Sequence, residues 1–73
     1  MAPKLPVVSG ILLVKVLVRS FGFEVVGREG SHVTLTNGSR FVTVPLHREL
    51  DRGTLAAILK DAGVGRNEFA DLV

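Results

Sequence analysis

Between residues 31 and 44, apolar and polar side chains alternate, and this period of two predicts two short strands joined by a tight turn. Asn37-Gly38 stands in the middle of the segment, and both residues tolerate the positive φ angles that a two-residue type I′ turn requires. With this pair in the turn, Thr36 is expected to oppose Ser39. The apolar face of the hairpin then carries Val33, Leu35, Val42 and Val44, and the other face carries His32, Thr34, Thr36, Phe41 and Thr43. The apolar face needs a cover, and the polar face is where functional groups are expected.

A helical period precedes the strands. Ser9 is expected to cap a helix that runs to about Phe21, and Gly22 is typical of the residue that ends such a helix. The period of 3.6 places Leu13, Val14, Leu17, Val18 and Phe21 on one face. Leu12 and Val16 lie outside this face, so the helix either is buried on both faces or contacts a partner, such as a second copy of the chain.

A second helical period follows the hairpin. Asp51 is expected to cap this helix and Gly63 to close it. Its buried stripe is predicted to be Leu55, Ile58, Leu59 and Ala62, with Ala56, Ala57 and Lys60 facing water. A short final helix is expected from about Arg66 to Leu72, with Phe69 and Leu72 docking on the core.

The remaining segments complete the order of elements. Residues 1–8 carry two prolines and are expected to be extended and partly frayed. A first strand is predicted from Phe23 to Arg28, with a turn at Glu29-Gly30. Pro45 should end the third strand because it has no amide to donate, and a loop follows over Leu46–Leu50. The predicted fold class is a single α+β domain over residues 1–73. It is a two-layer α-β-β-β-α sandwich, like double-stranded-RNA-binding domains, with two helices on one face of a three-stranded antiparallel sheet and a short C-terminal helix.

Composition narrows the function classes. The 73 residues include no cysteine, so disulfides and thiolate metal sites are excluded. The two histidines have no acidic cluster nearby, which argues against a structural zinc site, and no cofactor is expected. The longest apolar run, residues 11–18, is far short of the roughly 20 residues of a membrane span, so a cytoplasmic protein is expected.

Charge is divided unevenly along the chain. Residues 1–48 hold six basic and two acidic residues, whereas residues 49–73 hold three basic and five acidic residues. The positive charge therefore accompanies the hairpin, where a polyanion could use it.

Several short motifs resemble, in order and spacing, those of HicA-type toxins, which are small mRNA interferases of toxin–antitoxin pairs. The matching segments are Gly22-Phe23-Glu24-Val25-Val26, Gly30-Ser31-His32, Val44-Pro45-Leu46-His47, Gly53-Thr54-Leu55, Ile58-Leu59 and Ala62-Gly63. The resemblance covers about residues 9–72 and implies the same fold. It also implies cleavage of mRNA without a metal, an essential histidine at His32, and a HicB-type antitoxin that covers the active site. Many relatives carry a histidine or basic residue where this chain has Val33, and their first helix is more charged.

The chemistry of RNA cleavage agrees with this set of residues. The 2′-OH beside the scissile phosphate supplies the nucleophile, so a histidine base and nearby positive charge are sufficient. His32 is therefore the candidate catalytic base or acid; the alternative is a surface histidine bonded to its turn. The residues expected to contact RNA are Lys15, Arg19, Arg28, Ser31, Arg40, His47 and Arg48.

Three other interpretations stay open from the sequence. His47 is either a second acid–base group or a solvated loop residue, and Phe41 either stacks on a base or, the favoured interpretation, fills a gap beside the first strand. Gly53 is expected to allow close packing of its helix rather than anion binding. For the whole chain, the alternatives are a non-catalytic RNA-binding module, a pure interaction protein and a toxin relative without activity.

Overall fold

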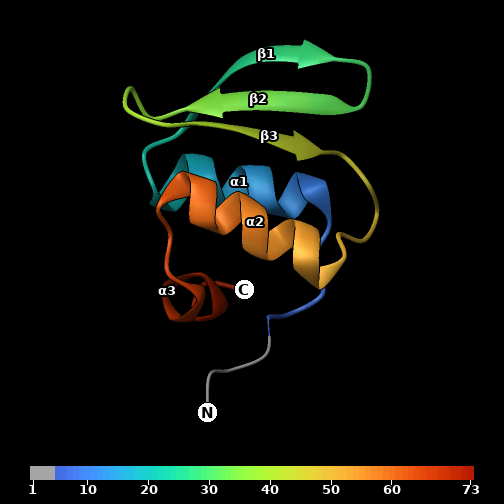
Figure 1. The fold of residues 1–73 in the computed structure, drawn as a ribbon, viewed down its shortest axis with the longest axis vertical. Coiled ribbons are helices and arrows are strands. Elements are labelled where there is room, and N and C mark those ends of the chain that lie inside the picture. Colours follow the sequence, from blue (N-terminus) through green and yellow to red (C-terminus); the bar gives the residue numbers. More distant parts are fainter. Residues whose placement is uncertain (1–4) are drawn as a thin grey trace.

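A computed structural model describes residues 5–73 of the chain (Figure 1). The elements in chain order are α1 (Gly10–Ser20), β1 (Glu24–Glu29), β2 (His32–Thr36), β3 (Phe41–Pro45), α2 (Arg52–Ala62) and α3 (Arg66–Ala70). The predicted α-β-β-β-α order with a short third helix is thus confirmed, and β1 begins one residue later than expected. The first four residues of the expected extended start lie outside the described residues.

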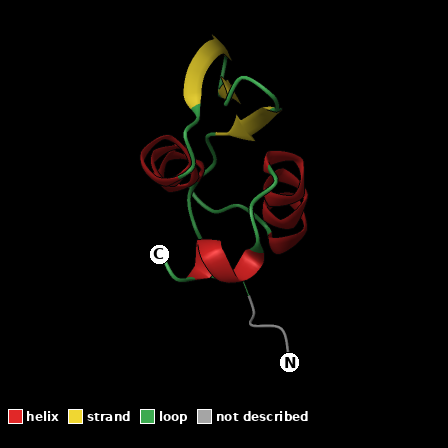
Figure 2. Cartoon of the chain, turned by 90° about the vertical axis from the view of Figure 1, so that its left-hand side faces the viewer, coloured by secondary structure: helices red, strands yellow, loops and turns green. Residues whose placement is uncertain are grey.

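The three strands form one antiparallel sheet in the order β1-β2-β3, and both long helices lie beneath the same face (Figures 1 and 2). Val33, Leu35, Val42 and Val44 of that face are 5% exposed or less, as the alternation predicted. α3 lies beyond the helices, at the far end of the molecule from the sheet. The opposite face of the sheet, which we call the open face, is not covered by either long helix.

The helices begin and end where their capping residues predict. The Ser9 hydroxyl accepts a hydrogen bond from the Leu12 amide at 3.0 Å, and the Asp51 carboxylate accepts one from the Thr54 amide at 2.8 Å. Gly63 closes α2 with φ +73°, a left-handed conformation that favours glycine. The predicted stripe of α2, which is Leu55, Ile58, Leu59 and Ala62, is buried.

The turn of the β2–β3 hairpin differs from the prediction. Thr36 pairs with Phe41 rather than Ser39, so residues 37–40 form a four-residue loop. No residue other than glycine has a positive φ among the described residues, which excludes a type I′ turn at Asn37. Instead, Asn37 Oδ1 accepts hydrogen bonds from the Ser39 amide at 2.9 Å and the Arg40 amide at 2.8 Å, a local alternative that asparagine favours. The register moves by two residues, so each side chain keeps its predicted face.

The buried side of α1 is rotated relative to the prediction. Val16 is 8% exposed and belongs to the core, whereas Val18 is 42% exposed and does not. The buried residues of α1 are Gly10, Leu13, Val16 and Leu17, so the buried side is shifted from Val14 and Val18 toward Leu13 and Val16. Of the two residues expected at a homodimer contact, Leu12 is 38% exposed, and Val16 is not available.

Three expectations about exposure need correction. Fraying does not extend to Leu5 and Val8, which are nearly fully buried, and the Val8 carbonyl accepts a hydrogen bond from the Leu50 amide at 2.8 Å, whereas Val7 between them is 56% exposed. Phe69 docks on the core as expected, but Leu72 is 49% exposed and only lines a groove beside α1. Phe41 is 68% exposed and fills no gap.

Candidate functional site

His32 is the first residue of β2, in the middle strand of the sheet. Its cross-strand neighbours are Glu29 of β1 and Pro45 of β3. The next residue, Val33, is buried against the helices, so the exposed His32 side chain belongs to the open face. The imidazole is therefore accessible to a ligand that approaches this face.

Main-chain hydrogen bonds bring three separate parts of the chain to this end of the sheet, on the right in Figure 1. The Leu46 amide donates to the Ser31 carbonyl at 2.6 Å, which joins the end of β3 to the start of β2. The Gly10 amide donates to the His47 carbonyl at 2.9 Å, which joins the start of α1 to the same loop. These two bonds place His47 at the same end of the molecule as His32.

Gly10 makes this junction sterically feasible. A Cβ atom at this position would overlap the Pro45 carbonyl oxygen and would lie 2.8 Å from the Leu46 Cα. Only a residue without a side chain lets the helix approach the strand end so closely. Sequence reasoning missed this role, because a glycine at the first position of a helix does not by itself indicate contact with a distant strand.

Arg28 lies at the same end, beside the β1–β2 turn, but it pairs with Val33 and therefore leaves β1 on the helix side of the sheet, opposite to His32. The Arg28 Nε atom donates to the Gly30 carbonyl at 3.1 Å, and Gly30 has φ +59°, which a glycine adopts readily. Arg48 follows His47 in the β3–α2 loop and is exposed. Together with Ser31 and His32, these residues form one group, which we call the histidine end: Arg28, Ser31, His32, His47 and Arg48.

The other expected RNA contacts lie elsewhere. Arg40 is at the opposite end of the sheet, where its Nη1 atom donates to the Asp61 carbonyl at 3.1 Å in the last turn of α2. Lys15 and Arg19 are on α1, where they line a small groove of about 210 Å³ with Leu12, Val16, Ser20 and Leu72. The structure therefore does not bring these three cations to His32.

The β3–α2 loop, which carries His47 and Arg48, ends at Asp51, the N-cap of α2. Hydrogen bonds from the Thr54 amide and from the Thr54 hydroxyl lower the pKa of the Asp51 carboxyl below its ordinary value of 3.8. The ionised carboxylate is thus the form that caps α2 and fixes where the loop ends.

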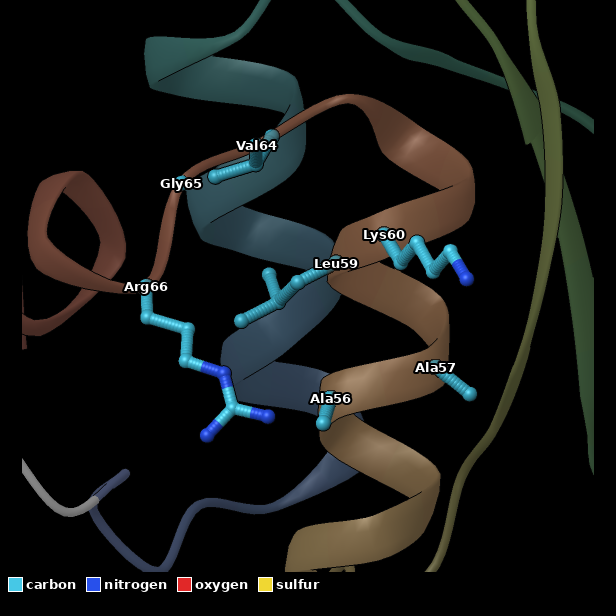
Figure 3. A pocket seen from close by; sticks show the side chains of 7 residues that line it. All are labelled: Ala56, Ala57, Leu59, Lys60, Val64, Gly65 and Arg66. Atoms are coloured by element: carbon cyan, nitrogen blue, oxygen red, sulfur yellow. The ribbon is translucent and has the colours of Figure 1, made fainter. Parts of the chain in front are cut away.

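A pocket of about 440 Å³ lies between α2 and the segment that leads to α3 (Figure 3). It is lined by Ala56, Ala57, Leu59, Lys60, Val64, Gly65 and Arg66. None of these residues belongs to the expected site.

Within residues 5–73, no group of three or more histidine, cysteine, aspartate or glutamate side chains could hold a metal ion. In the same part of the chain, no helix is long and apolar enough to cross a membrane.

Glu29 is a second residue that sequence reasoning did not connect with the site. The structure pairs it directly with His32, whereas the sequence indicated a turn at Glu29-Gly30. A carboxylate beside the imidazole is a feature that only the strand register reveals, since the register shifts at a bulge between Val25 and Gly27.

The fold and the histidine end define a class of protein, a small two-layer α-β-β-β-α sandwich with a polar open face. A family model described as "HicA toxin of bacterial toxin-antitoxin" matches residues 13–64. The chain belongs to this HicA toxin family, and it is therefore a toxin-type protein whose partner is an antitoxin. Comparisons with curated proteins and with solved structures gave no significant match.

Proposed function

We propose that the chain is an endoribonuclease that cleaves mRNA in the cytoplasm without a metal, with His32 as the general acid or base. The observation that supports this proposal is the exposed His32 side chain on the open face, with Arg28, His47 and Arg48 at the same end of the sheet. Membership of a toxin family agrees with an activity that harms the cell.

The proposed reaction uses the RNA's own 2′-OH as the nucleophile. A neutral imidazole accepts the 2′-hydroxyl proton, O2′ attacks the adjacent phosphorus, and the bond from phosphorus to the 5′-oxygen breaks. The departing 5′-oxygen takes up a proton, and the upstream fragment keeps a 2′,3′-cyclic phosphate. Neutral histidine is suited to this step because its ordinary pKa is close to physiological pH.

Charge development on the phosphate needs stabilisation, and the histidine end offers cations for it. Arg48 is exposed in the loop after β3, and we assign it to a phosphate next to the cut. Arg28 is exposed on the helix side of β1, with its Nε atom at the β1–β2 turn, and we assign it to a phosphate farther along the strand of RNA. His47 is the second acid–base candidate, because the Gly10 bond to its carbonyl fixes its backbone. Ser31 provides a further hydroxyl next to His32.

The test is a comparison of three purified proteins on a single-stranded mRNA fragment. His32→Ala should lose about 10²- to 10⁴-fold in cleavage rate, the range that general acid–base catalysis supplies. Asn67→Ala is the matched control, since Asn67 is an exposed polar residue of α3, at the far end of the molecule from the sheet. Circular dichroism establishes that each variant is folded. Wild-type cleavage rates in a folded His32→Ala protein would refute the assignment.

A non-catalytic RNA-binding module of the same fold is the second candidate. It predicts binding without cleavage and no effect of His32→Ala.

For the antitoxin, we propose a HicB-type protein that covers the histidine end. A homodimer contact would use Leu12, which is exposed on α1, and a mass measurement by light scattering tests it.

A further inference from the structure

Phe41 is the most exposed of the large apolar side chains in the described part of the chain, at 68%. It is the first residue of β3 and lies on the open face, since the following residue, Val42, is 4% exposed beneath the sheet. A phenyl ring held in water by a regular strand is a ready contact surface for another planar group.

The open face around Phe41 is mostly polar, and neither β2 nor β3 contains an aspartate or a glutamate. The residues that share the open face with Phe41 on β2 and β3 are His32, Thr34, Thr36, Thr43 and Pro45. The whole segment 30–48 contains no aspartate or glutamate, and the exposed Arg48 follows the end of β3, whereas the Arg40 guanidinium is bound to α2. The acids of the open face, Glu24 and Glu29, are in β1. A polyanion on the open face is therefore repelled less along β3 than along β1.

The strand register relates Phe41 to His32. Phe41 pairs with Thr36, and His32 pairs with Pro45, so the two side chains are on the same face, four residues apart along the hairpin. At the ordinary rise of a strand, this separation is about 13 Å. A few nucleotides of extended RNA span that distance.

We propose that Phe41 is a stacking platform for an unpaired base, and that the substrate is single-stranded RNA lying along β3 with its cut at His32. This inference rests on the proposed endoribonuclease function and adds a specificity-determining residue to it. A base within a duplex is already stacked on both sides and cannot pack on the ring, so Phe41 selects unpaired RNA. Aromatic rings accept any base face, so the platform determines strandedness rather than sequence.

The experiment uses a property of the composition. The chain has no tryptophan and no tyrosine, so Phe41→Trp introduces one fluorescent reporter at the proposed platform. The probe is a short 2′-O-methyl oligoribonucleotide, which lacks the 2′-OH and is not cleaved. Its binding should quench the tryptophan, whereas an abasic oligonucleotide of the same length should bind without quenching. Val18→Trp is the matched control, because Val18 is 42% exposed on α1, and its tryptophan fluorescence should not change when the oligonucleotide is added.

Affinity provides a second measurement on the same oligonucleotide. Phe41→Ala and Phe41→Leu should each weaken binding by about 5- to 150-fold, the range for loss of one base–aromatic stack, and Phe41→Trp should retain it. Binding without quenching, or an unchanged affinity of Phe41→Ala, overturns the platform and leaves the proposed ribonuclease standing. Absence of any RNA binding by the folded wild type overturns both. A two-chain mass that Phe41→Ala reduces to one chain assigns the ring to a contact between copies and overturns the platform.

Discussion

Gly10→Ala tests whether the close approach of α1 to the end of β3 is essential. Helix propensity alone predicts that alanine stabilises α1 by up to about 1 kcal/mol. In the structure, the added Cβ would overlap the Pro45 carbonyl oxygen and would lie 2.9 Å from the Pro45 carbonyl carbon, both of them backbone atoms. Overpacking of this kind costs about 1–3 kcal/mol, and loss of the hydrogen bond between Gly10 and His47 costs about 1 kcal/mol more. The net destabilisation should be about 2 kcal/mol.

Urea and thermal unfolding followed by circular dichroism measure this change, since the chain lacks tryptophan and tyrosine for fluorescence. The melting temperature of Gly10→Ala should fall by about 8–16 °C. Gly53→Ala is the matched control, because Gly53 is also in the first turn of a helix and its added Cβ would meet only the Asp51 side chain at 3.3 Å. This control should be as stable as the wild type or more so, by up to about 1 kcal/mol. A Gly10→Ala protein as stable as the wild type would refute the steric argument.

Three further predictions follow from burial, capping and charge. Phe69→Ala should cost about 3–5 kcal/mol because the ring is fully buried, whereas Leu72→Ala should change the unfolding free energy by less than about 0.5 kcal/mol; urea midpoints that are equal for the two variants would contradict this. The folded pKa of Asp51 lies below its unfolded value of 3.8, so the contribution of this cap is complete above that pH and is lost as the pH falls through the folded pKa. Asp51→Asn should therefore flatten the stability–pH curve in that acidic range, and an unchanged curve would count against the cap. Removing the charge of Arg28 or Arg48 should reduce the slope of log affinity for RNA against log salt by about 0.7 each, and an unaltered slope would exclude a phosphate contact.

Local patterns were sufficient to predict the elements of this fold. Ser9 and Asp51 carry the short polar side chains that cap helices, and the glycines at positions 22 and 63 adopt the left-handed conformation that ends them. The alternation in the hairpin predicted its buried face correctly even though the turn was wrong, because a register change of two residues preserves the side of every side chain.

Packing between distant segments could not be predicted in the same way. The close approach of α1 to the end of β3 depends on the contact of Gly10 with Pro45, and these residues are far apart in the sequence. The burial of Leu5 and Val8 depends on hydrogen bonds to Leu50 and Arg52, which local composition does not reveal. The proline content near the start indicated an extended conformation but contained no information about what the segment packs against.

The same contrast applies to the candidate site: sequence neighbours were predicted together, and contacts between distant segments were not. His32 and Ser31 were predicted as neighbours because they are adjacent in the sequence. Arg40, in contrast, was grouped with His32 only by its place in the hairpin, and the structure shows its guanidinium bound to the last turn of α2. The sequence therefore identified the cationic residues, but the strand register and the contacts between elements determine which of them can contact the same RNA.

The bonds that assemble the histidine end belong to peptide groups of Ser31, Leu46, Gly10 and His47, and not to their side chains. Substitutions of the exposed His47 can therefore change the chemical character of the histidine end while its shape persists. Toxins of this architecture can change their RNA target or their antitoxin through substitutions of exposed side chains at the histidine end, provided that Gly10 is retained.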